Sequence, residues 1–227
     1  MFNTLNHIAL ILDGNKRWAK KNNLSNFEGY TKGFQNIRNF VNYSLSVNLN
    51  YLTIFALSSE NFNRSSLDLI YKIIYNNFSE LFNELINENG VKIKIFGSRE
   101  NLPNKIKGIF EKIEQESYNN KKLSLNIAFN YGFKDEIKSF AYKIQNSDQK
   151  INIKNEKEIN ELFYLGSIPD PDLLIRTGGY QRLSNFIMHN LTYTELFFTK
   201  TLWPDFSENE FKSIIKSFYK INRKYGL

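Results

Sequence analysis

The stretch HIALILDGNKRWAKK, residues 7–21, decides the fold of this chain. Its apolar run from Ile8 to Leu12 predicts a buried strand, because a short apolar run that stops at a glycine-containing turn is typical of a parallel sheet. The residues that follow are Asp13, Gly14, Asn15, Lys16 and Arg17. Ligands of open α/β sheets bind at the carboxyl ends of strands, so this turn is a candidate for holding an anion through a metal ion. An ordinary polar turn is the alternative, since such turns are common.

The bulk composition narrows the classes of function. The chain has 227 residues, no cysteine, two histidines and a net charge of +7. This length predicts a single domain over residues 1–227, and the lack of cysteine excludes disulfides and thiolate chemistry. The positive charge favours an anionic partner, but no arginine-rich tract is present and nucleic acid is not expected as a partner. No apolar stretch is long enough to cross a bilayer and no signal peptide is visible, so we expect a soluble, cytoplasmic protein.

Strands and helices alternate along the chain. Apolar runs predict buried strands at Ile8–Leu12, Tyr51–Leu57, Val91–Phe96, Leu123–Phe129, Leu173–Ile175 and Leu196–Phe198. Helical periodicity fills the gaps at Lys32–Val47, Leu67–Asn87, Asn104–Tyr118, Lys134–Gln145 and Glu208–Arg223, and the Asn- and Lys-rich stretch Gln145–Lys157 is expected to be an exposed excursion. This alternation predicts an α/β fold with a parallel sheet covered by helices on both faces.

Polar groups follow the first five predicted strands. These segments are Asp13–Arg17, Ser58–Arg64, Gly97–Arg99, Asn130–Gly132 and Arg176–Gly179, the last with Arg182 and Ser184 just beyond it. The carboxyl ends of parallel strands lie at one edge of a sheet, so all five segments are expected to converge there. Glycine, amide, hydroxyl and guanidinium groups bind phosphate, and the edge is therefore a predicted phosphate site.

One predicted helix is apolar over a wide arc. Its apolar positions are Leu67, Ile70, Ile74, Phe78, Leu81, Phe82 and Leu85. Such a helix either packs in the core against the sheet or forms a wall of an elongated hydrophobic cavity. Amphipathicity alone does not separate the two.

Six motifs, in order and nearly from end to end, resemble those of the cis-prenyltransferases of the undecaprenyl diphosphate synthase type. They lie at His7–Lys21, Ala56–Arg64, Leu125–Gly132, Asp172–Gly179, Arg182–Phe186 and Thr194–Phe206. The resemblance implies a single six-stranded parallel sheet flanked by helices, enclosing an elongated hydrophobic tunnel, and a homodimer.

The resemblance also implies an activity. Isopentenyl diphosphate would be joined to an allylic diphosphate, such as farnesyl diphosphate, in successive cis additions that need Mg²⁺ and release diphosphate. The product would be a long-chain polyprenyl diphosphate that serves as a lipid carrier for cell-wall glycan assembly, with transient membrane contact. The alternative is a catalytically weak or silent relative that acts as a partner subunit.

Family roles carry over to matching positions. Asp13 and Glu195 would associate with Mg²⁺, and Asn61 lies where the family has a residue proposed to assist proton removal. An amide is a poor base, so we expect Asn61 to position substrate instead. The remaining substrate-binding residues implied are Gly14, Asn15, Lys16, Arg17, Trp18, Asn26, Tyr30, Ser58, Ser59, Glu60, Phe62, Arg64, Arg176, Arg182, Leu183 and Ser184.

Several positions depart from the family pattern. Asn26 stands where an arginine is typical, Tyr30 replaces a histidine and Tyr180 breaks the common Gly-Gly-Glu sequence. Phe62 replaces a tryptophan, and Lys16 stands where glycine or arginine is usual. Because positive groups are lost near the allylic diphosphate, we expect weaker allylic binding or slower turnover without loss of activity.

Overall fold

Six strands form one sheet in the order β3-β4-β2-β1-β5-β6, and every neighbouring pair is parallel. The computed structural model describes residues 4–62, 67–147 and 151–224, and within these it leaves out the side chains at 77–81 and 88. The strands are β1 His7–Ile11, β2 Tyr51–Ser58, β3 Val91–Phe96, β4 Leu123–Tyr131, β5 Leu173–Arg176 and β6 Glu195–Phe198. The predicted α/β fold with a six-stranded parallel sheet is confirmed.

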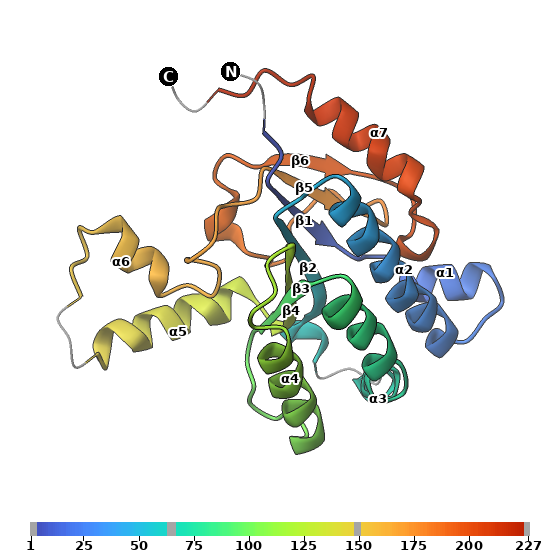
Figure 1. The fold of residues 1–227 in the computed structure, drawn as a ribbon, viewed down its shortest axis with the longest axis horizontal. Coiled ribbons are helices and arrows are strands. Elements are labelled where there is room, and N and C mark those ends of the chain that lie inside the picture. Colours follow the sequence, from blue (N-terminus) through green and yellow to red (C-terminus); the bar gives the residue numbers. More distant parts are fainter. Residues whose placement is uncertain (1–3, 63–66, 148–150, 225–227) are drawn as a thin grey trace.

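Helices cover both faces of this sheet unequally (Figure 1). They are α1 Asn15–Lys21, α2 Asn26–Ser46, α3 Leu67–Asn83, α4 Asn104–Glu116, α5 Phe133–Gln145, α6 Glu156–Glu161 and α7 Glu208–Phe218. A π-helical turn, Glu84–Glu88, continues α3, and single 3₁₀ turns lie at Ser59–Asn61, Met188–Leu191 and Trp203–Asp205. None of the helices in the described part of the chain is long and apolar enough to cross a membrane.

The larger core lies between the sheet and helices α2, α3, α4 and α7. Ile8, Leu10 and Ile54 point into it from the central strands, and Phe40 of α2 packs there within 5.1 Å of the Phe206 ring. The opposite face of the sheet carries a smaller cluster, in which Phe55 stacks on Phe186 at 4.6 Å. The strands are therefore buried on both faces, as expected for parallel strands.

Helix α2 begins at Asn26, six residues before the predicted start at Lys32. The reason is a capping box: the Ser25 backbone N–H donates to Glu28 Oε2 at 2.8 Å, and the Glu28 N–H donates to Ser25 Oγ at 3.3 Å. Two N–H groups that the first turn leaves without a helical partner are thus satisfied, and the helix extends to this point. The sequence Ser-Asn-Phe-Glu carries that signal.

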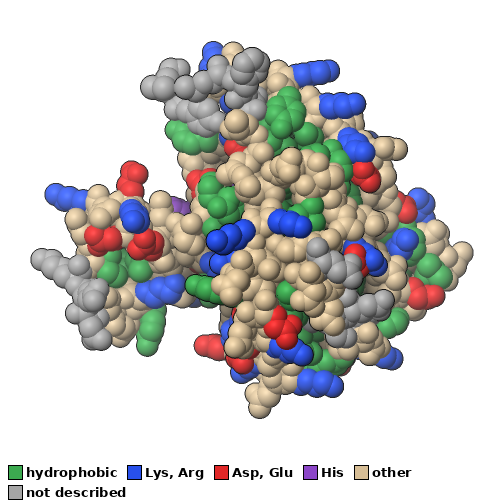
Figure 2. All heavy atoms as spheres, viewed as in Figure 1, with side chains coloured by type: hydrophobic (Ala, Val, Ile, Leu, Met, Phe, Trp, Pro, Cys, Tyr) green, Lys and Arg blue, Asp and Glu red, His purple; other side chains and the backbone are tan. Residues whose placement is uncertain are grey.

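Helices α5 and α6 project from the body of the molecule as an arm (Figures 1 and 2). Helix α6 begins within the last two residues of the stretch Gln145–Lys157, and most of the described residues of that stretch are exposed, as predicted. The arm exposes large apolar side chains: Tyr142 is 67% exposed and Ile153 is 71% exposed.

Candidate active site

Asp13 lies directly beyond β1, where two arginines bind its carboxylate. Arg176 donates from Nη2 to Asp13 Oδ2 at 2.9 Å, and Arg17 donates from Nη2 to Asp13 Oδ1 at 3.0 Å. Thr177 fixes the backbone, since its hydroxyl donates to the Asp13 carbonyl at 2.8 Å and accepts from the Asp13 N–H at 3.0 Å. The aspartate is therefore held from both its side chain and its backbone.

Two glycines with positive φ make this approach possible. Gly14, at φ 125°, follows Asp13, and Gly178, at φ 85°, follows Thr177. A Cβ at Gly178 would lie 2.6 Å from Arg17 Nη2 and 2.9 Å from the Asp13 carbonyl oxygen. Only glycine combines that backbone conformation with that close approach, so the two turns depend on it.

The guanidinium group of Arg176 holds several residues of the site together through hydrogen bonds. Its side chain is only 4% exposed, and it donates from Nη1 to Ser184 Oγ at 2.7 Å and to the Arg182 carbonyl oxygen as well as to Asp13. Ser184 adopts a positive φ of 50°, which turns the loop back over the end of β5. The Arg-Thr-Gly-Gly and Arg-Leu-Ser-Asn-Phe motifs thus meet through Arg176.

These groups line a polar cavity of about 370 Å³ at the carboxyl ends of β1, β2 and β5. Of the predicted site residues, the structure brings together here Asp13, Gly14, Asn15, Lys16, Arg17, Tyr30, Ser58, Glu60, Asn61, Arg176, Arg182 and Ser184. Four of them are cations and two are carboxylates, so the cavity is suited to an anion.

Other predicted residues lie beside the cavity and contact something else. Trp18 donates from Nε1 to Asp205 Oδ1 at 2.6 Å, and Ser59 donates to Asp135 Oδ2 at 2.7 Å. Phe62 packs against the larger core and Leu183 against the smaller one. Asn26 is the exposed first residue of α2, and Arg64 lies outside the described residues.

The predicted convergence of five strand ends at one edge is confirmed by the all-parallel sheet, but only the ends of β1, β2 and β5 line the polar cavity. The end of β4 adjoins it, since a Cβ at Gly132 would lie 2.6 Å from Ser59 Oγ. The sheet order separates β3 from β1 by two strands, so its end lies too far away. Arg99 instead donates from Nη2 to Glu114 Oε2 at 2.9 Å and to the Ile95 carbonyl at 2.8 Å. Strand order, which no motif encodes, decides which loops reach the site.

Glu195 stands at the opposite end of the sheet from Asp13. It is the first residue of β6 and pairs with Leu173, the first residue of β5. Its carboxylate lies 3.8 Å from Arg223 Nε, and it is not among the described residues that line the polar cavity. The role of Glu195 at a metal therefore stays a prediction.

The donor set fits a magnesium ion that arrives with a phosphate. The described residues contain no group of three or more His, Cys, Asp or Glu placed to bind a metal. Mg²⁺ does not need such a cage, because it is commonly held by one or two carboxylates together with substrate phosphates and water. Asp13 and Glu60 are the carboxylates that line the polar cavity, and Asp13 is the one fixed in place.

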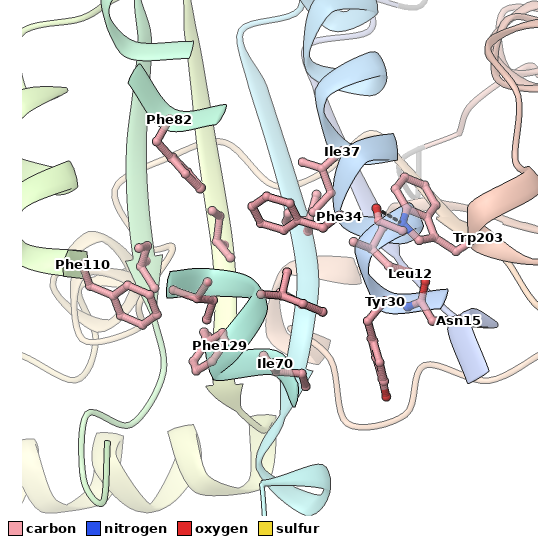
Figure 3. Close-up of a pocket in the computed structure, with 17 residues that line it drawn as sticks. Leu12, Asn15, Tyr30, Phe34, Ile37, Ile70, Phe82, Phe110, Phe129 and Trp203 are labelled. Carbon is pink, nitrogen blue, oxygen red and sulfur yellow. Dashed lines mark hydrogen bonds between the residues drawn. The ribbon is translucent and has the colours of Figure 1, made fainter. Parts of the chain in front are cut away.

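An apolar cavity of about 100 Å³, whose lining is drawn in Figure 3, adjoins the polar one. The two share Leu12, Asn15, Tyr30, Ala56 and Ile70. Its other lining residues are Gly33, Phe34, Ile37, Ile54, Ile73, Ile74, Phe82, Ile95, Phe110, Ile127, Phe129 and Trp203. A polar mouth rich in cations thus adjoins an apolar interior between the sheet and helices α2 and α3.

Helix α3 both packs in the core and forms a wall of the apolar cavity, which are the two roles that its amphipathicity left open. Ile70, Ile74 and Phe82 line the apolar cavity, whereas Tyr71, and Leu85 of the π-helical turn that continues α3, are buried in the larger core. The side chains of Phe78 and Leu81 lie outside the described ones. An elongated tunnel stays a prediction, and the cavity lies where that tunnel would be.

Sequence reasoning missed several contributors to the site, and three of them are informative. Thr177 holds the backbone of Asp13, Tyr180 lines the polar cavity, and Phe34 of α2 lines the apolar one. Thr177 and Tyr180 flank the Gly-Gly pair after β5, so a strand ending in a glycine turn was the available signal. The position of Phe34 depends on the packing of α2, for which sequence offers only periodicity.

Residues 11–226 match the family model described as "Putative undecaprenyl diphosphate synthase". An isoprenyl transferase from Fusobacterium nucleatum is 40% identical over 97% of this chain and 95% of that relative. The chain belongs to this family. The resemblance inferred from the six motifs is confirmed.

Solved structures agree with this assignment. Lavandulyl diphosphate synthase from Lavandula x intermedia, crystallised with dimethylallyl diphosphate, superposes with a TM-score of 0.91 at 30% identity, over 98% of both chains. A "probable undecaprenyl diphosphate synthase" from Campylobacter jejuni gives a TM-score of 0.82 at 28% identity, covering 99% of this chain and all of that one.

Proposed function

We propose that this prenyltransferase condenses isopentenyl diphosphate with an allylic diphosphate, such as farnesyl diphosphate, in successive cis additions that yield a long-chain polyprenyl diphosphate. The observation that carries the proposal is the continuity of the polar cavity with the apolar cavity through Tyr30, Ala56 and Ile70. A prenyl diphosphate has the same two parts, a charged head and an apolar chain. Its head fits the cationic mouth and its chain fits the apolar interior.

The chemistry explains why cations dominate the mouth. An allylic diphosphate reacts when its C–O bond breaks, and negative charge then develops on the departing diphosphate. Arg17 lies beside Asp13 in a cavity that also contains Lys16, so positive groups are already in place where that charge appears. Such preorganised charge stabilises the transition state without reorganising during the reaction.

The second substrate would be held by Arg176, Arg182 and Ser184. A planar guanidinium binds diphosphate oxygens in pairs, and Ser184 orients Arg176 from Nη1. Carbon–carbon bond formation leaves a proton to be removed from the isopentenyl unit. Asn61 lines the same cavity, and its amide can orient the substrate but is too weak a base to take that proton. We assign Asn61 a positioning role.

Magnesium is part of the proposal, with Asp13 as the residue that would hold it. When bound, the ion would neutralise charge on the leaving diphosphate. Asp13 is suited to this because Arg17 and Arg176 fix the orientation of its carboxylate while 29% of its side chain stays exposed to the cavity.

The proposal extends to a homodimer that works in the cytoplasm and meets the membrane transiently as the product lengthens. Exposed apolar side chains on the α5–α6 arm, at Ile137, Tyr142 and Ile153, support burial against a second copy. The membrane contact follows from the lipid character of the lengthening product. No contact of the described residues favours the alternative of a silent partner subunit.

The test is incubation of the purified protein with farnesyl diphosphate, radiolabelled isopentenyl diphosphate and Mg²⁺, with the products separated by chain length. We expect a series of products that ends near one long chain, and no incorporation when EDTA is added. No incorporation by folded protein with Mg²⁺ and both substrates would contradict the proposal.

A further inference from the structure

The polar cavity contains an aromatic ring that three arginines share. Tyr180, two residues beyond the Gly178 turn, lines the cavity and is 43% exposed. The guanidinium carbon lies 4.2 Å from the centre of its ring for Arg182, 4.8 Å for Arg17 and 5.8 Å for Arg176. All three distances are within the range of a cation–π interaction, which extends to about 6 Å.

The three arginines differ in how firmly other contacts hold them. Arg176 is bound by Asp13, Ser184 and a carbonyl oxygen, and Arg17 donates to Asp13 and, at 2.6 Å, to the Gly178 carbonyl. Among the described residues, Arg182 donates one side-chain hydrogen bond, from Nε to Ser184 Oγ at 3.4 Å. Beside this long hydrogen bond, the face of the Tyr180 ring is the contact that supports the Arg182 guanidinium.

A ring supports a guanidinium differently from a carboxylate. The ring attracts the cation through its face and leaves the N–H edges available, whereas a carboxylate would occupy the N–H groups that a diphosphate needs. The ring also lets like charges gather without adding an anion that would repel the substrate. Its location is fixed, because the Gly178 and Gly179 N–H groups each donate at 2.8 Å to carbonyls beyond β6, those of Thr201 and Thr199.

We propose that Tyr180 is a positioning residue of the diphosphate site, whose ring holds Arg182 in place for a substrate diphosphate and supports Arg17 from the same face. This inference rests on the proposed function, since it assigns a role within that site. The proposal predicts that diphosphate binding needs the ring of Tyr180 more than its hydroxyl. It also predicts that the position of Arg182 depends on this ring more than the position of Arg176 does.

The experiment measures binding of inorganic diphosphate by calorimetry, together with kcat and KM for isopentenyl diphosphate. Tyr180→Leu removes the ring, Tyr180→Phe keeps it, and Tyr118→Leu is the matched control. Tyr118 is another exposed tyrosine, 68% exposed, with Lys92 at 4.7 Å from its ring, and it does not line the polar cavity. We expect Tyr180→Leu to weaken diphosphate binding and to raise KM by roughly 3- to 10-fold with a smaller change in kcat, while the other two match wild type.

A double-mutant cycle tests the link to Arg182. If Tyr180 acts through Arg182, then Tyr180→Leu has little further effect on diphosphate affinity in an Arg182→Ala background. Wild-type affinity in Tyr180→Leu, equal loss in Tyr180→Phe, or independent multiplication of the two effects would each overturn the inference while leaving the proposed function intact. Failure of the wild-type protein to bind diphosphate would overturn both.

Discussion

Arg176 donates to Asp13 across 2.9 Å, although 163 residues separate the two in the chain. The parallel pairing of β1 with β5 sets Ile11 opposite Arg176, so the residues at the two strand ends share one mouth. The carboxylate in turn compensates the charge of a guanidinium that is only 4% exposed. This contact joins the groups proposed to bind the two substrates.

We predict that Asp13→Ala lowers kcat/KM by about 100-fold or more, because it removes the carboxylate that would hold Mg²⁺ at the departing diphosphate and that fixes Arg17 and Arg176 in place. Asp13→Asn is the matched variant, since it keeps the shape and loses the charge, and we expect a comparable loss. Incorporation of labelled isopentenyl diphosphate measures the rate. Thermal melting shows whether the buried Arg176 charge, left without its partner, also destabilises the fold. Near-normal rates in Asp13→Asn would contradict the electrostatic role.

The sequence predicted which kinds of residue form this site better than it predicted which parts of the chain reach it. Asp13 and Arg176 were identified because each follows a short apolar run and precedes a glycine turn. Arg99 also follows a predicted strand and a glycine yet lies away from the site, because such a pattern marks a strand end and not the order of strands in the sheet. Glu195 matches a family motif but directly precedes the predicted strand Leu196–Phe198, so the rule of strand carboxyl ends does not place it near Asp13.

The start of α2 was predicted wrongly for a local reason. The lining of the apolar cavity was not predicted because it depends on tertiary packing. The capping box at Ser25 and Glu28 was present in the sequence, but the apolar periodicity that predicted α2 becomes regular only later. Phe34 was not singled out in the sequence, and Phe82 belonged to an apolar arc that left both a core position and a cavity wall open. They line one cavity because α2 and α3 pack side by side over the sheet, which is a property of the folded chain.

The close packing of α2 next to the apolar cavity can be tested by a substitution at Gly33. A Cβ there would lie 2.0 Å from Asn15 Oδ1 and 2.9 Å from Cδ1 of the buried Trp203 ring. We predict that Gly33→Ala lowers the free energy of unfolding by about 1–3 kcal/mol through overpacking. Gly108→Ala in α4 is the control, because a Cβ there meets nothing within 4 Å and alanine favours a helix by about 1 kcal/mol. Urea denaturation distinguishes the two, and equal stability of both variants would contradict the packing argument.

His7 makes stability depend on pH. Burial lowers the pKa of His7 from 6.5 to about 4, and its ring contacts the Pro169 carbonyl and Thr53 Oγ1, each at 2.7 Å. Above pH 6.5 the ring is neutral in both states. Between pH 6.5 and 4 the unfolded chain takes up a proton that the folded chain refuses, so stability falls as the pH falls.

We therefore predict that the contribution of His7 to the free energy of unfolding drops by about 2 kcal/mol between pH 7 and pH 5. His7→Gln keeps a hydrogen-bonding side chain but has no proton to gain. Urea denaturation at both pH values should show a smaller fall for the variant than for wild type. Identical pH slopes would show that His7 is not the titrating group.

Phe82 lies at the inner end of the apolar cavity, away from Tyr30 at its mouth (Figure 3). Its ring is 3% exposed and lies 6.4 Å from the Phe34 ring, so the two close the space between α2 and α3. A growing prenyl chain that enters from the mouth would meet Phe82 after passing Phe34. We predict that Phe82→Leu shifts the product distribution to chains longer by one or more isoprene units, because a smaller side chain lengthens the space available.

Phe211→Leu is the matched control for this prediction. Phe211 is as deeply buried, with its ring 4.9 Å from Phe40 and 5.3 Å from Tyr43, but it does not line the cavity. Both substitutions remove a similar amount of packing, so a general loss of stability would affect them alike. Chromatographic separation of labelled products reports chain length directly. A product shift in both variants would trace the effect to loosened packing, and no shift in Phe82→Leu would show that this ring does not limit the chain.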